Sequence, residues 1–150
     1  PSPITLEAAL LDTGRPILVA PPAALGDCGR HIAIAWEGSP EAARVISDAI
    51  PFLASARQVT ILACETALTV PLSSRELVSR LAWHGIAAKT HDFSVGATEL
   101  GPAFLDQSAK VGADMLIKGA YSQSRLRQLI LGGRTRHILA HATLPVLLAH

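Results

Sequence analysis

The segment from Leu116 to Leu139, LIKGAYSQSRLRQLILGGRTRHIL, contains the residue types that most directly suggest chemistry. A short apolar run ends at Gly119 and is followed by small residues, and a pair of glycines, Gly132 and Gly133, precedes a helical pattern. Glycines let the backbone approach a ligand closely, and the free amides at a helix N-terminus attract anions. The segment therefore indicates either a phosphate-binding loop or the remains of one.

The charges of the sequence are unevenly distributed and point to the same segment. No acidic residue follows Asp114, whereas five of the thirteen basic residues do: Lys118, Arg125, Arg127, Arg134 and Arg136. The first 114 residues carry the other eight basic residues and all twelve acidic ones, so the two parts have net charges of −4 and +5. This separation favours an anion, or an acidic partner surface, near the C-terminal segment.

Other chemistries are less compatible with these residues. His137 and His141 have the i, i+4 spacing of a metal site, but no Asp, Glu or Cys lies near them, so we expect a solvated helix face and no metal. Ser122 and Ser124 lack both a G-x-S-x-G turn and a downstream acid, and no catalytic nucleophile is predicted. Only Tyr121 lies among the arginines, so nucleic-acid binding is not expected.

Length and composition predict a single globular domain outside the membrane. The chain has 150 residues, of which 49% are hydrophobic and 17% charged. Its apolar runs are interrupted within roughly ten residues, whereas a membrane-spanning helix needs about 20. Cys28 and Cys64 lack CxxC spacing, and we expect free, partly buried thiols in a reducing compartment. Without the pattern of a signal peptide, a cytoplasmic protein is expected.

Alternating β-like and helical patterns predict a parallel α/β sheet. Strands are expected at residues 31–36, 58–64, 86–93, 114–119 and 144–150, with a helix before each strand after the first. Ser39 and Pro40 favour a helix start, as does the capping box of Ser73 and Glu76. Thr98 is expected to cap the helix before the fourth strand, and the last helix is expected at 134–142. These elements are needed to position the glycines and charges.

The first 25 residues resemble the end of a domain more than its beginning. A strand-like run at 16–20, PILVA, follows a helical pattern, as PVLLA at 145–149 does at the end of the chain. We therefore expect residues 1–25 to be the helix tail, last strand and linker of a preceding copy. Residues 26–150 are then expected to form the domain itself.

With AWEGS after the first strand, GADMLIKGAYSQSRLRQLILGGRTRHIL around the fourth, and PVLLAH at the end, the chain resembles the universal stress protein family. In particular it looks like the C-terminal half of a tandem member. The resemblance implies an adenine nucleotide alpha hydrolase-like α/β fold. This is a five-stranded parallel sheet in the order 3-2-1-4-5 with helices on both faces, to which the extra N-terminal strand is added. The two informative segments would meet at its switch point.

Nucleotide-binding members of this family share the motif G-x2-G-x9-G-[ST]. Gly119 and Gly132 occupy two of its four positions at the right spacing, whereas Ser122 and Gly133 replace the second glycine and the Ser or Thr. A side chain at 122 costs on the order of 1 kcal/mol if that position needs positive φ. Arg134 is unfavourable for the helix dipole but well placed for an anion. Two interpretations follow: the segment still binds a phosphate, or it is kept as a scaffold that no longer binds ATP.

The adenine side of the implied site is also altered. Glu37 stands where nucleotide-binding members have an Asp near the ribose, and Trp36 stands where they have a small residue. The Trp36 ring could stack on a base or fill the adenine space. The Lys118 ammonium is expected to face either phosphate or Glu37. The candidate nucleotide-binding residues are Ala35, Trp36, Glu37, Leu62, Lys118, Gly119, Ser122, Gly132, Gly133, Arg134 and Thr135.

The resemblance implies a binding and assembly module of the stress response with a degenerate adenine-nucleotide site. Its cofactor would be ATP or another adenine nucleotide with Mg²⁺, and no catalytic residue is assigned. The alternatives are a nucleotide-free structural half of a tandem protein and a slow ATP-hydrolysing protein. The apolar edge at 144–149 predicts a homodimer through this strand, with 15–20 as a second candidate partner strand.

Overall fold

A computed structural model describes residues 3–23, 26–64, 73–96, 99–120 and 133–150 of the chain. Its centre is a six-stranded sheet in the order β1-β6-β5-β2-β3-β4, in which only β1 is antiparallel to its neighbour. The strands are β1 (Ile17–Val19), β2 (His31–Trp36), β3 (Gln58–Cys64), β4 (Ala88–Phe93), β5 (Met115–Gly119) and β6 (Val146–Ala149). The sheet thus differs from a five-stranded parallel one by the antiparallel strand β1 at the β6 edge.

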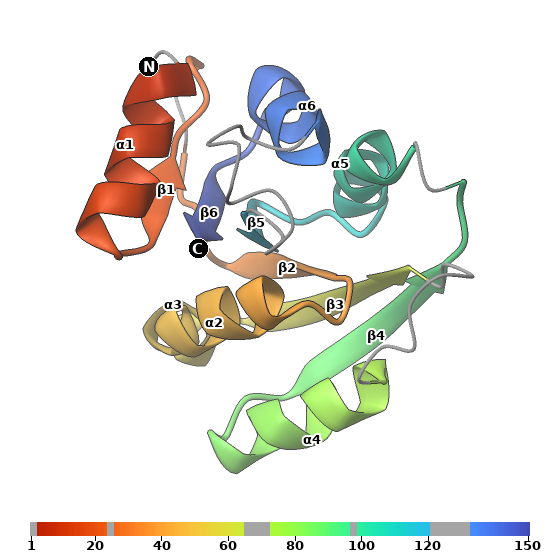
Figure 1. Ribbon diagram of the computed structural model, residues 1–150. Helices are drawn as coiled ribbons and strands as arrows, with labels where there is room; N and C mark the ends of the chain where they lie inside the picture. Colours follow the sequence, from red (N-terminus) through yellow and green to blue (C-terminus); the bar gives the residue numbers. More distant parts are fainter. Residues whose placement is uncertain (1–2, 24–25, 65–72, 97–98, 121–132) are drawn as a thin grey trace.

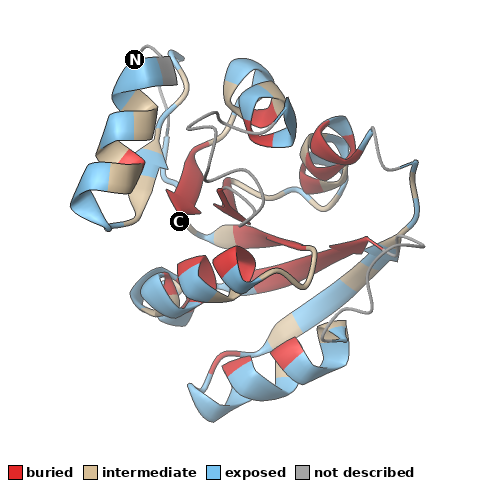
Figure 2. Ribbon diagram, viewed as in Figure 1, coloured by how far each residue is buried: buried red, intermediate tan, exposed pale blue. Residues whose placement is uncertain are grey.

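Helices cover both faces of the sheet (Figure 1). One face carries α2 (Pro40–Asp48), α3 (Ile50–Ser55) and α4 (Ser74–Trp83), and the other carries α1 (Pro3–Thr13), α5 (Leu100–Lys110) and α6 (Gly133–His141). Alternate strand residues supply the two cores. In β2, for example, Ile34 packs toward α2 whereas Ala35 packs toward the α5 and α6 face. Figure 2 shows the central strands buried and β4 largely exposed at its edge.

Several local signals in the sequence have their expected geometry. The Ser39 hydroxyl accepts a hydrogen bond from the Ala42 amide, 3.1 Å away, at the start of α2. Ser73 and Glu76 form both hydrogen bonds of a capping box before α4. Gly85 and Gly112 have φ of 73° and 71°, which a left-handed helix stop requires. These signals depend on neighbours within a few residues, and so the sequence alone suffices to predict them.

Other expectations need correction. The strand expected from residue 86 begins at Ala88, and α5 begins after Glu99, which provides no side-chain cap. Thr98, the predicted cap, lies outside the described residues. Cys28 and Cys64 are free, but Cys28 is exposed rather than partly buried, because it lies in the loop before β2.

Within the part of the chain that the structure describes, no helix is long and apolar enough to span a membrane.

Asp114 joins the start of β5 to the entrance of β2. Its Oδ1 accepts the Gly29 and His31 amides at 2.9 and 3.2 Å, and its Oδ2 accepts the Arg30 amide at 3.1 Å. Three backbone donors therefore share one carboxylate. This contact fixes the register of β2 relative to β5, and the other ends of these two strands form the site described below.

Replacing Asp114 by Ala is expected to lower the free energy of unfolding by about 2 kcal/mol, because three backbone donors lose their acceptor. Urea denaturation followed by circular dichroism measures the change. The matched control is Asp92→Ala on the exposed strand β4, which is expected to change stability by less than about 0.5 kcal/mol. Equal effects of the two variants would contradict the role assigned to Asp114.

Candidate functional site

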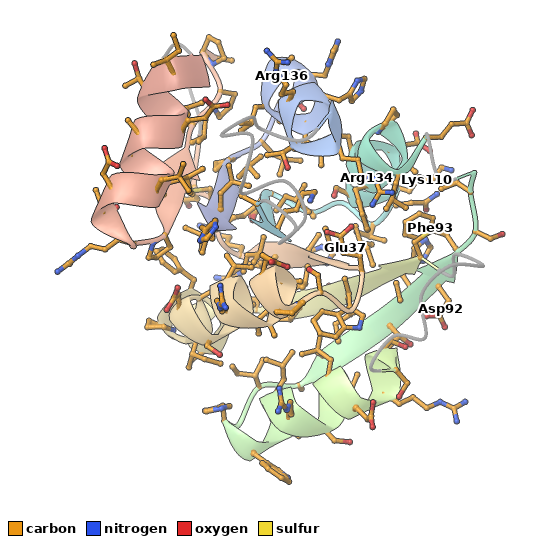
Figure 3. All side chains as sticks on the ribbon, viewed as in Figure 1. Glu37, Asp92, Phe93, Lys110, Arg134 and Arg136 are labelled. Carbon is orange, nitrogen blue, oxygen red and sulfur yellow. The ribbon has the colours of Figure 1, made fainter. Side chains whose placement is uncertain are left out.

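The candidate site lies where the strand order reverses, at the carboxyl ends of β2 and β5. Lys118 is the partner of Ala35 in the parallel register, and Glu37 follows β2 directly. Arg134 comes from the first turn of α6 and reaches the same place, as Figure 3 shows for Glu37 and Arg134. Open α/β sheets bind their ligands in the crevice at such a switch point. The structure therefore brings together three charged residues from three separated segments.

Glu37 is held by two cations. Its Oε1 lies 3.5 Å from the Lys118 Nζ, and its Oε2 lies 3.3 Å from the Arg134 Nη1. The Lys118 ammonium also donates a 2.9 Å hydrogen bond to the Gly119 carbonyl. Burial lowers the pKa of Lys118, whose side chain is only 4% exposed, and the charge of Glu37 and its hydrogen bond oppose this shift. Of the two environments proposed for Lys118, the structure shows the contact with Glu37.

Glu41 is a member of this charged group that we did not predict. It lies in the first turn of α2, is only 3% exposed, and its negative charge also acts on Lys118. An acidic residue directly after a Ser-Pro helix start was the available signal, although it predicts helix stabilisation rather than burial. With Glu37, Glu41, Lys118 and Arg134, the group contains two acidic and two basic side chains. It therefore has no excess positive charge for a phosphate.

Gly119 has a structural reason to lack a side chain. A Cβ at this position would lie 2.5 Å from the Ala42 nitrogen and 2.7 Å from the Glu41 carbonyl carbon. These are backbone atoms of α2, which cannot move aside as a flexible side chain could. The end of β5 and the start of α2 are thus in direct contact, and this contact alone accounts for the glycine.

Trp36 packs on the opposite side of the sheet from Leu62 and Ala35. It is 3% exposed and belongs to the core formed with α2, α3 and α4, where it lines a hollow of about 330 Å³ beside Ile46 and Leu77. Ala35 and Leu62 lie in the core toward α5 and α6. Of the two roles considered for Trp36, its burial supports the filling of interior space.

Among the described residues of the candidate site, those at the beginning of α6 differ in exposure. Gly133 is the first residue of the helix, and a Cβ added there would meet no atom within 4 Å. Arg134 is exposed, whereas Thr135 is 3% exposed and faces the interior. Ser122 and Gly132 lie outside the described residues.

The two histidines of α6 contact each other. Their rings stack with centroids 4.2 Å apart, and the His141 Nδ1 donates a 2.9 Å hydrogen bond to the His137 carbonyl. Across the described ranges, no group of three His, Cys, Asp or Glu side chains has an arrangement that could hold a metal ion.

The mostly parallel sheet with helices on both faces, whose strand order reverses between β2 and β5, defines a doubly wound α/β protein. The sequence matches the model of the universal stress protein family over residues 29–150, and the chain belongs to this family. Among curated proteins, none matches the sequence significantly.

Solved structures of the same family have a similar fold at low sequence identity. A universal stress protein from Archaeoglobus fulgidus DSM 4304 superposes with a TM-score of 0.76 at 16% identity. The match covers 96% of this chain and 54% of that protein, which is thus about twice as long. UspA from Lactobacillus plantarum has a TM-score of 0.63 at 15% identity. That match covers 83% of this chain and 100% of the L. plantarum protein. A universal stress protein solved in complex with cAMP has a TM-score of 0.65 at 18% identity. That match covers 83% of this chain and 98% of the other protein.

The buried position of Lys118 predicts a pH dependence. Because burial lowers its pKa below 10.5 in the folded state, the unfolded chain binds more protons between the lowered value and 10.5. The free energy of unfolding contributed by this group is expected to rise with pH across that window. Urea denaturation of the wild type and of Lys118→Met from pH 7 to 10 isolates the effect by difference. The prediction would be contradicted if the stability of the wild type, taken relative to Lys118→Met, fell as the pH rises.

Proposed function

We propose that this chain is a binding and assembly module of the stress response whose adenine-nucleotide site is weakened. The observation that carries the proposal is the double ion pair of Glu37 with Lys118 and Arg134 at the switch point. In nucleotide-binding members the family resemblance implies an acidic residue near the ribose at the position of Glu37. Here a ribose would compete with two cations for the same carboxylate, and this competition lowers the affinity.

The phosphate side supports the same proposal. An anion at the start of α6 would meet free helix amides and the partly exposed Arg134. However, Arg134 is shared with Glu37, and the acidic and basic side chains of the group balance. The favoured ligands are therefore ATP with Mg²⁺ or a smaller adenine nucleotide such as cAMP, bound weakly. Both carboxylate oxygens of Glu37 already contact cations, and this arrangement favours a binding role over the activation of an attacking water.

Pairing of β1 with β6 supports the proposal of a tandem origin. β1 runs antiparallel to β6, with Ile17 opposite Leu148 and Val19 opposite Val146. Two last strands related by an approximate two-fold axis would meet in this way. The longer A. fulgidus protein also matches 96% of the chain, whereas the two shorter structures match 83%. We propose that residues 1–25 belong to a preceding copy and that 26–150 form the second domain.

The same pairing bears on self-association. Because β1 occupies the outer edge of β6, a homodimer through 144–149 requires β1 to leave that edge or to exchange with the β1 of a second copy. The β6 edge therefore already serves strand pairing in this structure. This observation favours, as the second candidate function, a nucleotide-free half that serves assembly alone. The two free thiols, Cys28 and Cys64, are consistent with the cytoplasmic location that we propose.

Nucleotide binding is tested on the purified protein in two ways. Denaturation followed by mass spectrometry detects any nucleotide that was retained, and calorimetry with ATP and with cAMP, each with and without Mg²⁺, measures affinity. We expect dissociation constants of about 1 mM, or roughly −4 kcal/mol. Absence of released nucleotide together with absence of heat at millimolar concentrations would overturn the binding proposal and favour the nucleotide-free half.

Variants identify the cause of weak binding. Ser122→Gly combined with Gly133→Ser restores the family motif and is expected to tighten ATP binding. Arg75→Gln, on the exposed surface of α4, is the control and is expected to have no effect. If the restored motif binds no better than the wild type, the obstacle lies at Trp36 or in the Glu37 ion pairs.

A further inference from the structure

A hollow whose lining includes none of the candidate-site residues lies between the N-terminal segment and the last helix and strand. Its volume is about 460 Å³, within the range of small-molecule sites. Leu6 of α1 and Val19 of β1 line one side, and Leu139, Leu144 and Val146 line the other. The hollow exists because β1 pairs with β6, where Val19 lies opposite Val146. It is thus formed only when the N-terminal segment is docked.

The lining has an unusual chemical composition. It consists of Leu, Val, Ala and Pro side chains together with one charged residue, Arg136, and includes no acidic residue. Arg136 is exposed on α6 (Figure 3). Among the residues that the structure describes, none forms an ion pair or hydrogen bond with its guanidinium, in contrast to Arg134. The neighbouring acidic residues Glu7 and Asp12 belong to α1 but do not line the hollow.

We propose that this hollow binds a free medium-chain fatty acid. Its hydrocarbon chain would lie against the apolar lining, where water finds few hydrogen-bond partners, and its carboxylate would pair with Arg136. The combination of an apolar lining with one arginine sets the class of ligand. An uncharged lipid would leave the Arg136 guanidinium without an anion, and a small hydrophilic anion would leave the apolar lining in contact with water. Because residues on both sides of the hollow would contact the hydrocarbon chain of the fatty acid, binding would also hold α1 and β1 in place.

The test uses the whole chain and calorimetry with hexanoate, octanoate and decanoate below their micellar concentrations. Affinity is expected to rise about fourfold for each added methylene. Arg136→Gln is expected to weaken octanoate binding about tenfold and to leave octanol binding unchanged. Ala140→Phe, one turn after Arg136 on the same exposed lining, is expected to abolish binding by filling the hollow. The matched control is Arg75→Gln on α4.

Two further readouts locate the bound acid. Both tryptophans of the chain, Trp36 and Trp83, line the smaller hollow between α2 and α4, so their fluorescence is expected to stay constant. Decanoate is expected to slow amide hydrogen exchange in α1 and β1 but not in β4. The proposal is overturned by affinities that do not depend on chain length, by an Arg136→Gln protein that binds octanoate as the wild type does, or by a fluorescence change that follows the titration.

Discussion

Glu37→Gln is expected to lower the free energy of unfolding by about 2 to 3 kcal/mol, a large effect for a residue outside the core. The substitution leaves the Lys118 ammonium, whose side chain is 4% exposed, without the carboxylate that contacts it. Removing one member of a fully buried pair costs more, but the Glu37 side chain is 23% exposed and solvent screens part of the interaction. Guanidinium denaturation monitored by tryptophan fluorescence measures the change.

A second substitution tests the cause. Lys118→Met replaces the buried ammonium by an apolar side chain of similar length, and we expect this protein to be as stable as the wild type or more stable. Adding Lys118→Met to Glu37→Gln should therefore restore most of the lost stability. The control is Asp106→Asn, which breaks the exposed pair with Lys110 and is expected to cost less than about 0.5 kcal/mol. A double variant no more stable than Glu37→Gln would contradict the explanation.

Gly119→Ala is expected to destabilise the protein by about 3 kcal/mol, the upper end of the range for overpacking. The added methyl group would lie 2.5 Å from the Ala42 nitrogen, and relief requires movement of the whole α2 N-terminus. Since α2 packs against both β5 and β6, that movement disturbs the core. Thermal and urea denaturation measure the loss, and the crystal structure of the variant would show displacement of α2.

Gly133→Ala is the matched control, because it makes the same chemical change at the other end of the motif. A methyl group there meets nothing within 4 Å, and the position is helical. We expect stability to be unchanged or higher by up to about 1 kcal/mol, since the unfolded chain loses conformational freedom. If both variants were equally destabilised, the close approach of α2 would not be the reason for Gly119.

The two ends of the motif thus differ in what a side chain would disturb. At Gly119 the packing of the fold requires glycine whether or not a nucleotide binds, so its presence is weak evidence for a ligand. At Gly133 the space is open, so replacing it by Ser is possible without loss of packing. For this reason Gly133, rather than Gly119, is the informative position for restoring a phosphate site.

The sequence allowed the candidate site to be placed but not its contacts. Glu37 was named from the family resemblance, Lys118 from its place at the end of a strand, and Arg134 from its place at a helix start. That the carboxylate contacts both cations depends on the register of β2 with β5 and on the docking of α6. Glu41 was missed, because the burial of a first-turn acidic residue depends on the strand that packs beside it.

The sequence by itself determined the alternation of strands and helices, the caps at Ser39 and Ser73, and the helix stops at Gly85 and Gly112. These features follow from side-chain periodicity and from hydrogen bonds or φ angles within a few residues. Only the tertiary structure decided which face Trp36 occupies, what Gly119 avoids and which partner Lys118 finds. Those outcomes are distances between segments far apart in the chain, and they are set by sheet register and helix packing.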